Sequence, residues 1–312
     1  MMRFLILCAA VTLLILSVTL AADPTATPAS DQEVLFDDFN YTAADDPALS
    51  DNGWIVRTVD GWPGVPGAVW RAENVSFVDD ADTERSEGNR LMQMTSSADG
   101  ENTYQTQVCQ GRKFYEGTYA SRVHFSDVPA VGPDGDNVVQ TFYLISPQKA
   151  DMDPDYSELD FEYLPNGGWG APDHILSTTT WETFQLDPWI ADNASDFDQK
   201  SFDGWHTLVV QIADGAAYYF VDGEPFAAHD GKYYPEVPMS MNYNLWFING
   251  GQIASSEPRE YVEQVDWAYF AANTVLEPDE VEAQVADLRD QDVTFTDTVP
   301  EWTPPLESPC NF

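Results

Sequence analysis

The stretch WHTLVVQIADGAAYYFVDGEPFAAH, from Trp205 to His229, decides the fold class. The dipeptide Asp214-Gly215 separates two runs of alternating residues, and Asp222-Gly223 closes the second run. Asp-Gly between such runs is the strongest short-range signal of a β-hairpin, because both residues tolerate the positive φ of a tight turn. This part of the chain is therefore predicted to form antiparallel strands.

Further strands are predicted on both sides of the hairpin. Turn clusters of Gly, Pro, Asn and Asp separate them at short intervals, which is typical of an all-β, two-sheet antiparallel sandwich. The other predicted strands are VLFDDFNY (34–41), ENVSFVDD (73–80), NRLMQMTSS (89–97), GTYASRVHF (117–125), VVQTFYLIS (138–146), ILSTTTWETFQL (175–186), SMNYNLWFI (240–248) and EQVDWAYFAA (263–272).

The chain is predicted to contain one sandwich domain with short additions at both ends. Residues 1–22, with Arg3 before an apolar run and small residues at its end, predict a signal peptide and secretion to the extracellular space. An uncleaved membrane anchor is the alternative. Residues 23–32 are a Pro/Thr-rich spacer, 33–274 are the predicted sandwich, and 275–312 are a helix and an extended tail expected to pack on it. In that helix Val281, Val285 and Leu288 recur at helical spacing.

Outside the predicted signal peptide the chain has two cysteines, Cys109 and Cys310. An even number in an exported protein favours one disulfide, which would tie the C-terminus to the first half of the domain. Two unrelated thiols are the alternative. The sequence has no CxxC pair and only four histidines, so a zinc site is not expected.

The formal net charge is −40, from 53 acidic and 13 basic residues. This excess argues against nucleic acid and anionic lipid as partners, since both need a basic patch. It also disfavours an acidic polysaccharide. A strongly acidic protein surface suits a saline or calcium-rich medium, where ions screen the repulsion between its negative charges. We expect a monomer that has no membrane contact once the signal is removed.

Three acidic residues alternate with apolar ones in SELDFEYL, from Ser157 to Leu164. On a strand, Glu158, Asp160 and Glu162 point to one face, because the side-chain period is two. Like charges this close raise the pKa of at least one carboxyl group. Hydrolysis of a glycosidic bond needs one ionised carboxylate beside one that keeps its proton. A solvated acidic face or a calcium site would give the same pattern.

SELDFEYLPN resembles the active-site strand of glycoside hydrolase family 16, in which Glu, an aliphatic residue, Asp, an apolar residue and Glu follow one another. GTYASRVHF, GWHTLVVQIADGAAYYFVDGEPF, MNYNLWFINGG and VDWAYF are similar to other family segments and occur in the family's order, over about 34–270. The resemblance implies a concanavalin-like jelly roll. It also implies that Glu158 is the nucleophile, Asp160 the assisting residue and Glu162 the general acid/base.

The chain departs from the family at several points. VVQTFYLIS lacks a Trp that many members carry, and the segment after Trp169 follows neither the bacterial glucanases nor the plant enzymes. Substrate contacts are expected from six residues, for each of which core packing is the alternative. These are Arg122, Tyr143, Trp169, Trp181, Asn244 and Trp246. His206 is expected to be structural. No cofactor is required, although the resemblance implies a structural calcium at Asp266.

The sequence therefore predicts a secreted retaining endo-glycosidase that acts on a neutral polysaccharide, with a β-glucan expected. Two alternatives remain: a transglycosylase that uses the same three residues, and a non-catalytic sandwich that binds glycans. The complete Glu-x-Asp-x-Glu pattern disfavours the second alternative, since a binding module does not need an Asp with one Glu on each side of it.

Overall fold

The computed structural model describes residues 32–81, 88–308 and 310, and these form seventeen β-strands, two α-helices and two short 3-10 helices. The predicted all-β antiparallel sandwich is confirmed. The predicted signal peptide, 1–22, and all of the spacer except residue 32 lie outside the described residues. Neither helix of the described part is long and apolar enough to cross a membrane.

Seven strands form an inner sheet in the order β11, β10, β9, β8, β15, β6 and β2, and the short β3 pairs with β6. The bounds of these strands are β2 Trp54–Val56, β3 Val69–Trp70, β6 Thr103–Gln110, β8 Val138–Ile145, β9 Glu158–Leu164, β10 Ile175–Gln185, β11 Ile190–Gln199 and β15 Ser240–Phe247.

The other strands form an outer sheet in which β7 and β16 are central. Their bounds are β1 Val34–Asp37, β4 Val75–Asp79, β5 Arg90–Ala98, β7 Gly117–Phe125, β12 Gly204–Ala213, β13 Ala216–Val221, β14 Glu224–Asp230, β16 Arg259–Ala272 and β17 Phe295–Asp297. The helices are α1 Pro47–Asp51 and α2 Pro278–Asp290, and the 3-10 helices are Ala72–Asn74 and Gly231–Tyr233.

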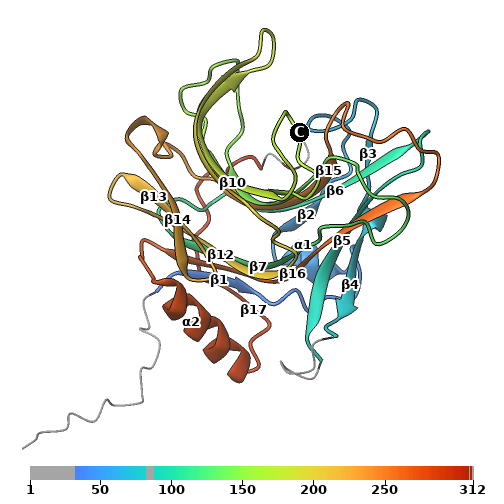
Figure 1. Cartoon of the computed structure of the whole chain (residues 1–312). Helices are drawn as coiled ribbons and strands as arrows, with labels where there is room; N and C mark the ends of the chain where they lie inside the picture. Colours follow the sequence, from blue (N-terminus) through green and yellow to red (C-terminus); the bar gives the residue numbers. More distant parts are fainter. Residues whose placement is uncertain (1–31, 82–87, 309, 311–312) are drawn as a thin grey trace, which may run out of the picture. The chain divides into compact units, whose positions relative to one another are not determined.

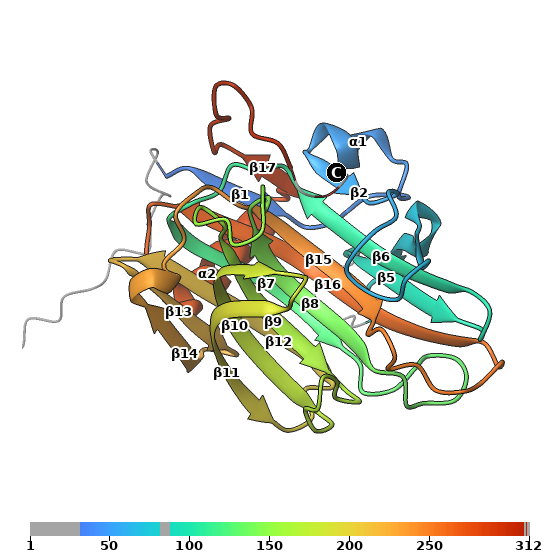
Figure 2. The ribbon, with the colours of Figure 1, turned by 90° about the horizontal axis from the view of Figure 1, so that it is seen from above.

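The two sheets lie face to face (Figures 1 and 2). The inner sheet curves upward at both sides in Figure 1, so its surface that points away from the outer sheet is concave. The main hydrophobic core lies between the sheets, because alternate residues of most of the longer strands point inward. Buried members from both sheets include Phe142, Phe161, Tyr219, Tyr243 and Val265. The other face of the inner sheet is therefore free to carry polar side chains.

The predicted hairpin forms as expected. Asp214 and Gly215 have φ of 53° and 81°, and Asp222 and Gly223 have φ of 52° and 81°. Positive φ at both central residues is what a type I′ turn requires, and its twist matches that of the flanking strands. These two turns connect β12 to β13 and β13 to β14.

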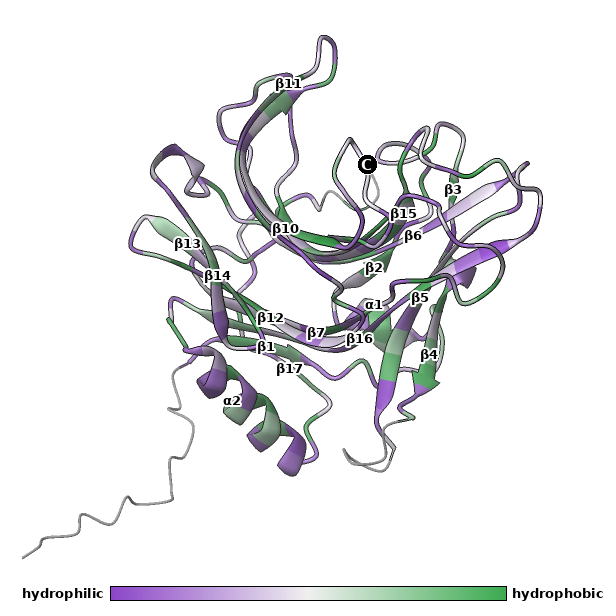
Figure 3. Ribbon diagram, viewed as in Figure 1, coloured by the Kyte–Doolittle hydropathy of each residue, from purple (hydrophilic) through white to green (hydrophobic). Residues whose placement is uncertain are grey.

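Helix α2 packs on the outer face of the outer sheet and carries both hydrophobic and hydrophilic residues (Figure 3). Pro278 is its first residue, and Glu277 and Glu280 form a capping box that satisfies free backbone N–H groups. Val281 and Val285 are buried against Trp267 and Tyr269 of β16. The apolar spacing in the sequence thus identified the face of the helix that is buried.

The C-terminal tail crosses from the outer sheet to the inner one. β17 pairs with β1, and the Lys113 ammonium then binds Asp297 and Glu301, each at 2.7 Å. At the end of the tail Cys310 forms a disulfide with Cys109 of β6, across 201 residues of sequence. The predicted pairing of the two cysteines is therefore present in the structure.

Candidate active site

The three acidic residues of β9 lie in the middle of the inner sheet, between β8 and β10. Glu158 is opposite Ile145 and Trp181, while Glu162 is opposite Thr141 and Ser177. The intervening residues Leu159, Phe161 and Tyr163 are buried in the core. The carboxyl groups of Glu158, Asp160 and Glu162 therefore share the concave face, as the alternation predicted.

Two neighbouring side chains hold these carboxyl groups by hydrogen bonds. The Tyr156 hydroxyl donates to Glu158 Oε2 at 2.5 Å, and Trp181 Nε1 donates to Asp160 Oδ2 at 3.0 Å. Asp160 also forms a hydrogen bond with Glu158. Glu158 thus receives donors from both sides along the strand.

Burial raises the pKa of all three carboxyl groups. It raises the pKa of Glu158 to about 8 and that of Glu162 to about 7, and the pKa of Asp160 lies well above its usual range. The charges of Glu158 and Glu162 raise the pKa of Asp160 further. The raised pKa favours the protonated form of Asp160, which can donate to Glu158.

The order of the two glutamate pKa values does not match the predicted roles, because a nucleophile should lose its proton before the general acid does. The hydrogen bonds do match them. The bonds from Tyr156 and Asp160 both lower the pKa of Glu158, whereas only burial shifts that of Glu162. The donors aimed at Glu158 therefore favour its ionised form.

Sequence reasoning missed an aromatic cluster at the Glu158 end of the strand. Its centre is Phe184 of β10, which contacts Tyr156, Trp62, Trp181 and Trp189 at ring-centroid distances of 5.3, 5.9, 5.9 and 6.0 Å. Trp62 and Trp189 are each 57% exposed. Flat exposed rings beside the carboxylates are suitable partners for the apolar faces of sugars.

Five of the six predicted substrate-binding residues lie in the inner sheet or in the turn after β9. Tyr143 is opposite Asp160, and its hydroxyl accepts hydrogen bonds from Gln107 at 2.6 Å and from Asn244 at 3.3 Å. Trp181 contacts Asp160, as described above. Trp246 of β15 is buried against Trp169, which is 65% exposed, with 5.7 Å between ring centroids. These side chains lie on the same sheet face as the carboxylates or beside it.

The sixth predicted binding residue, Arg122, is not in this site. It lies on β7 of the outer sheet, where its Nε is 3.5 Å from Asp266 and its guanidinium lies 5.3 Å from the ring centroid of Trp205. Its neighbours on the strand, Ser121 and Val123, point into the core instead. Arg122 therefore points away from the inner sheet. The prediction that it contacts sugar at this site is wrong.

His206 is placed by two hydrogen bonds on β12. Its Nδ1 lies 2.7 Å from Asp222 and its Nε2 lies 3.0 Å from the carbonyl oxygen of Phe202. Both partners belong to the outer sheet or its loops. The arrangement is that of a residue that holds the end of the hairpin.

The surroundings of Asp266 do not fit the expected calcium ion. This buried carboxylate accepts hydrogen bonds from Arg289 Nη2 at 2.7 Å and from Asn89 Nδ2 at 2.9 Å, and Arg122 lies nearby. Arg289 also binds Asp38. Calcium needs six or more oxygen ligands, and here a guanidinium already bridges the two carboxylates. In the part of the chain that the structure describes, no group of three or more His, Cys, Asp or Glu could hold a metal.

Two cavities lie away from the three carboxyl groups. One, of about 460 Å³, is lined by residues that include Val65, Thr103 and Gln252. The other, of about 310 Å³, is lined by residues that include His124 and Trp205 on the outer sheet. The candidate active site thus lies on the concave sheet face, and neither of these cavities contains it.

Comparisons with solved structures identify this fold. No protein-family model and no curated protein matches the sequence. A Bacteroides ovatus mixed-linkage-glucan GH16 enzyme, in complex with a product, aligns with a TM-score of 0.56 and 14% identity over 75% of this chain and 98% of its own. The Bacillus licheniformis β-glucanase aligns with a TM-score of 0.52 and 14% identity over 76% and 97%. A lichenase from a mouse hindgut metagenome gives 0.51 and 16% over 76% and 98%. The protein therefore has the fold of glycoside hydrolase family 16.

Proposed function

We propose that this protein is a secreted, retaining endo-β-glycosidase that hydrolyses internal bonds of a neutral polysaccharide, with a β-glucan as the substrate. The observation that carries the proposal is the arrangement of Glu158, Asp160 and Glu162 on the concave face, with donors aimed at Glu158. Similar structures include a β-glucanase and an enzyme in complex with a glucan product, which supports the substrate class. The disulfide between Cys109 and Cys310 supports export.

In the proposed reaction Glu158 is ionised and Glu162 is protonated when the polysaccharide binds. A Glu158 oxygen attacks the anomeric carbon, the glycosidic C–O bond breaks, and Glu162 gives its proton to the leaving oxygen. Glu162 then takes a proton from water, whose oxygen attacks the same carbon and releases Glu158. Asp160 keeps its proton and donates a hydrogen bond to Glu158. Tyr156 does the same from the other side.

A non-catalytic glycan-binding role is less well supported. Exposed rings such as Trp62 and Trp169 would serve binding alone. Burying three carboxyl groups beside each other destabilises the fold, however, and binding a neutral sugar does not need it. Groups whose pKa values are strongly shifted by burial are typical of catalytic sites.

The test is a panel of laminarin, mixed-linkage glucan, xyloglucan, agarose and carrageenan. We expect cleavage of a neutral member, and we expect Glu158→Gln to abolish it. Glu162→Ala should lose roughly 10²–10⁴-fold in rate on the polysaccharide. The same variant should keep most of its first-step rate on an aryl glycoside, whose acidic leaving group needs no proton.

Two results would contradict this assignment. One is an active Glu158→Gln variant, and the other is an equal loss on both substrates for Glu162→Ala. Product analysis with an added acceptor oligosaccharide distinguishes hydrolysis from transglycosylation, which uses the same residues.

A further inference from the structure

A loop from the far edge of the inner sheet reaches the nucleophile end of the candidate site. The loop, residues 57–68, follows β2 at one edge of the sheet, and it is called the Trp62 loop below. Phe184 belongs to β10, and four strands (β6, β15, β8 and β9) separate β10 from β2. In a flat sheet these two strands would be about 24 Å apart. The rings of Trp62 and Phe184 nevertheless lie 5.9 Å apart, so the loop extends over the concave face.

The main chain of the Trp62 loop is fixed by a buried arginine. Arg57 is 3% exposed, and its guanidinium donates to the carbonyl oxygens of Val59 at 2.8 Å and Trp62 at 3.1 Å. Its Nη1 donates to Gln107 Oε1 of β6 at 2.8 Å. The loop is therefore anchored on the sheet by a side chain that holds three oxygen acceptors.

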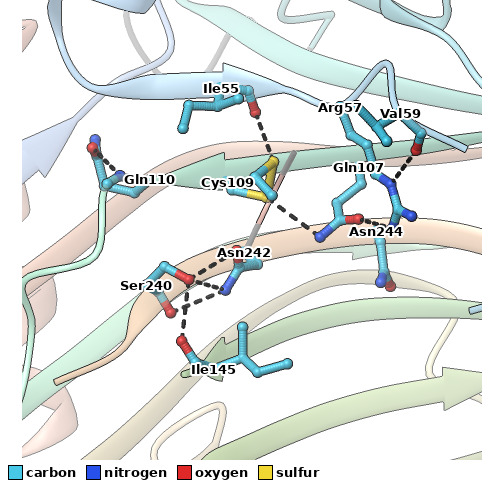
Figure 4. The surroundings of a disulfide bond; sticks show 12 residues. Ile55, Arg57, Val59, Gln107, Cys109, Gln110, Ile145, Ser240, Asn242 and Asn244 are labelled. Carbon is cyan, nitrogen blue, oxygen red and sulfur yellow. Dashed lines mark hydrogen bonds between the residues drawn. A yellow bond between two sulfur atoms is a disulfide. The ribbon is translucent and has the colours of Figure 1, made fainter. Parts of the chain in front are cut away.

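Gln107 lies between this anchor and the disulfide (Figure 4), and it also contacts the active-site face through Tyr143. Its Nε2 lies 2.6 Å from the Tyr143 hydroxyl and 3.3 Å from Cys109 Sγ, and Tyr143 is opposite Asp160. The disulfide to Cys310 thus lies directly against the residue that orients Arg57. The buried contacts on both sides of Gln107 restrict the position of the loop.

Trp62 lies close to the residue that holds Glu158. Phe184 contacts both Trp62 and Tyr156, and the Tyr156 hydroxyl donates to Glu158. A sugar bound at Glu158 would therefore lie beside the Trp62 ring, under a loop that crosses the sheet. A linear chain can pass beneath such a loop, whereas side chains on the same sugar would collide with it.

We propose that the Trp62 loop is a specificity element that covers the site beside Glu158 and restricts it to linear polysaccharides without side chains. This inference rests on the glycosidase function proposed above. It assigns Trp62 a role in excluding substituted chains, in addition to any stacking on a sugar ring.

The test compares kcat/KM for linear and branched laminarin, and for linear mixed-linkage glucan and xyloglucan. The wild type should prefer the linear member of each pair. Trp62→Ala should reduce this preference by roughly tenfold, with a gain on the branched member. Trp302→Ala, which removes an exposed Trp of the C-terminal tail, should leave the preference unchanged. The double variant Cys109→Ser/Cys310→Ser should shift the preference in the same direction as Trp62→Ala. Without the disulfide, the position of Cys109 against Gln107 is less restricted.

The possible outcomes are distinct. If Trp62→Ala lowers kcat/KM equally on linear and branched substrates, the ring only stacks on sugar and the inference is overturned. A wild type that cleaves both members equally well overturns it too. A wild type that cleaves no polysaccharide overturns the proposed function, and this inference with it.

Discussion

Glu158 and Glu162 differ in the hydrogen bonds that reach them, although burial raises the pKa of both. Tyr156 and Asp160 donate to Glu158, and only burial shifts the pKa of Glu162. A donor stabilises the ionised carboxylate, so the hydrogen bonds agree with the proposed roles of Glu158 as the nucleophile and Glu162 as the acid. In the proposed mechanism, the division of roles between two identical side chains therefore depends on their neighbours.

Replacing Tyr156 by Phe tests this division. The hydroxyl lowers the pKa of Glu158, so its loss should raise that pKa, and the acidic limb of the kcat/KM profile should move to higher pH by about one pH unit. Loss of a hydrogen bond to a charged group should also lower kcat by roughly tenfold or more. The measurement is a pH–rate profile on the polysaccharide that the wild type cleaves. The matched control is Tyr218→Phe, an exposed tyrosine of β13.

An acidic limb that does not move in Tyr156→Phe would show that the hydroxyl does not set the charge of Glu158. A uniform loss of activity at every pH would show that the hydroxyl supports the reaction without setting the pKa of Glu158.

The sequence predicted which face of β9 carries the three carboxyl groups, but not every residue on that face. Tyr156 continues the alternation of Glu158, Asp160 and Glu162 by one step upstream, and this signal could have identified it. Arg122 was placed wrongly for a physical reason. Alternation separates the two faces of one strand, but a sandwich has two sheets and therefore four faces. A polar residue on the outer face of the outer sheet looks the same in sequence as one on the concave face.

At the level of elements, strands with a clear apolar alternation were predicted and polar ones were not. The predicted hairpin and the segments that became β7, β8, β9 and β15 lie where the pattern placed them. In contrast β11, IADNASDFDQ, was not predicted, because it is rich in Asp and Asn and mostly exposed. Its pairing with β10 along ten residues overrides that weak propensity. Tertiary pairing of this kind is not visible in the local sequence.

Helix α2 supplies a cation to the outer sheet, and this predicts stability without calcium. Arg289 binds Asp266 and Asp38, which are 0% and 7% exposed. Arg289→Ala should destabilise the fold by roughly 3–5 kcal/mol, because it removes the guanidinium that bridges two buried carboxylates. Urea unfolding measures the loss. Lys149→Ala, which breaks an exposed pair with Asp155, is the control and should cost about 1 kcal/mol or less.

The same unfolding measurement is repeated in excess calcium and in the chelator EDTA. The wild-type unfolding midpoint should be the same in excess calcium and in EDTA, since Arg289 already neutralises Asp266. A wild type that loses stability in EDTA would contradict this view, as would an Arg289→Ala variant as stable as the wild type.

For the whole molecule, the net charge of −40 opposes the compact state. Added salt should therefore raise the unfolding midpoint. Most of the gain should come at low concentration, because the screening length falls from about 30 Å at 0.01 M to about 10 Å at 0.1 M. Thermal unfolding in a sodium chloride series measures this effect. Sucrose at matched osmolarity is the control, because it stabilises proteins without screening charge.

A charge-reduced variant separates self-repulsion from other effects of salt. Glu73, Glu224 and Glu260 are exposed acidic residues on the surface of the described domain. Replacing all three by Gln lowers the negative charge without touching the core or the candidate site. This variant should have a higher midpoint than the wild type at low salt and a weaker response to added salt. Equal responses in the two proteins, or a wild-type midpoint that does not change with salt, would show that self-repulsion does not limit the stability of this fold.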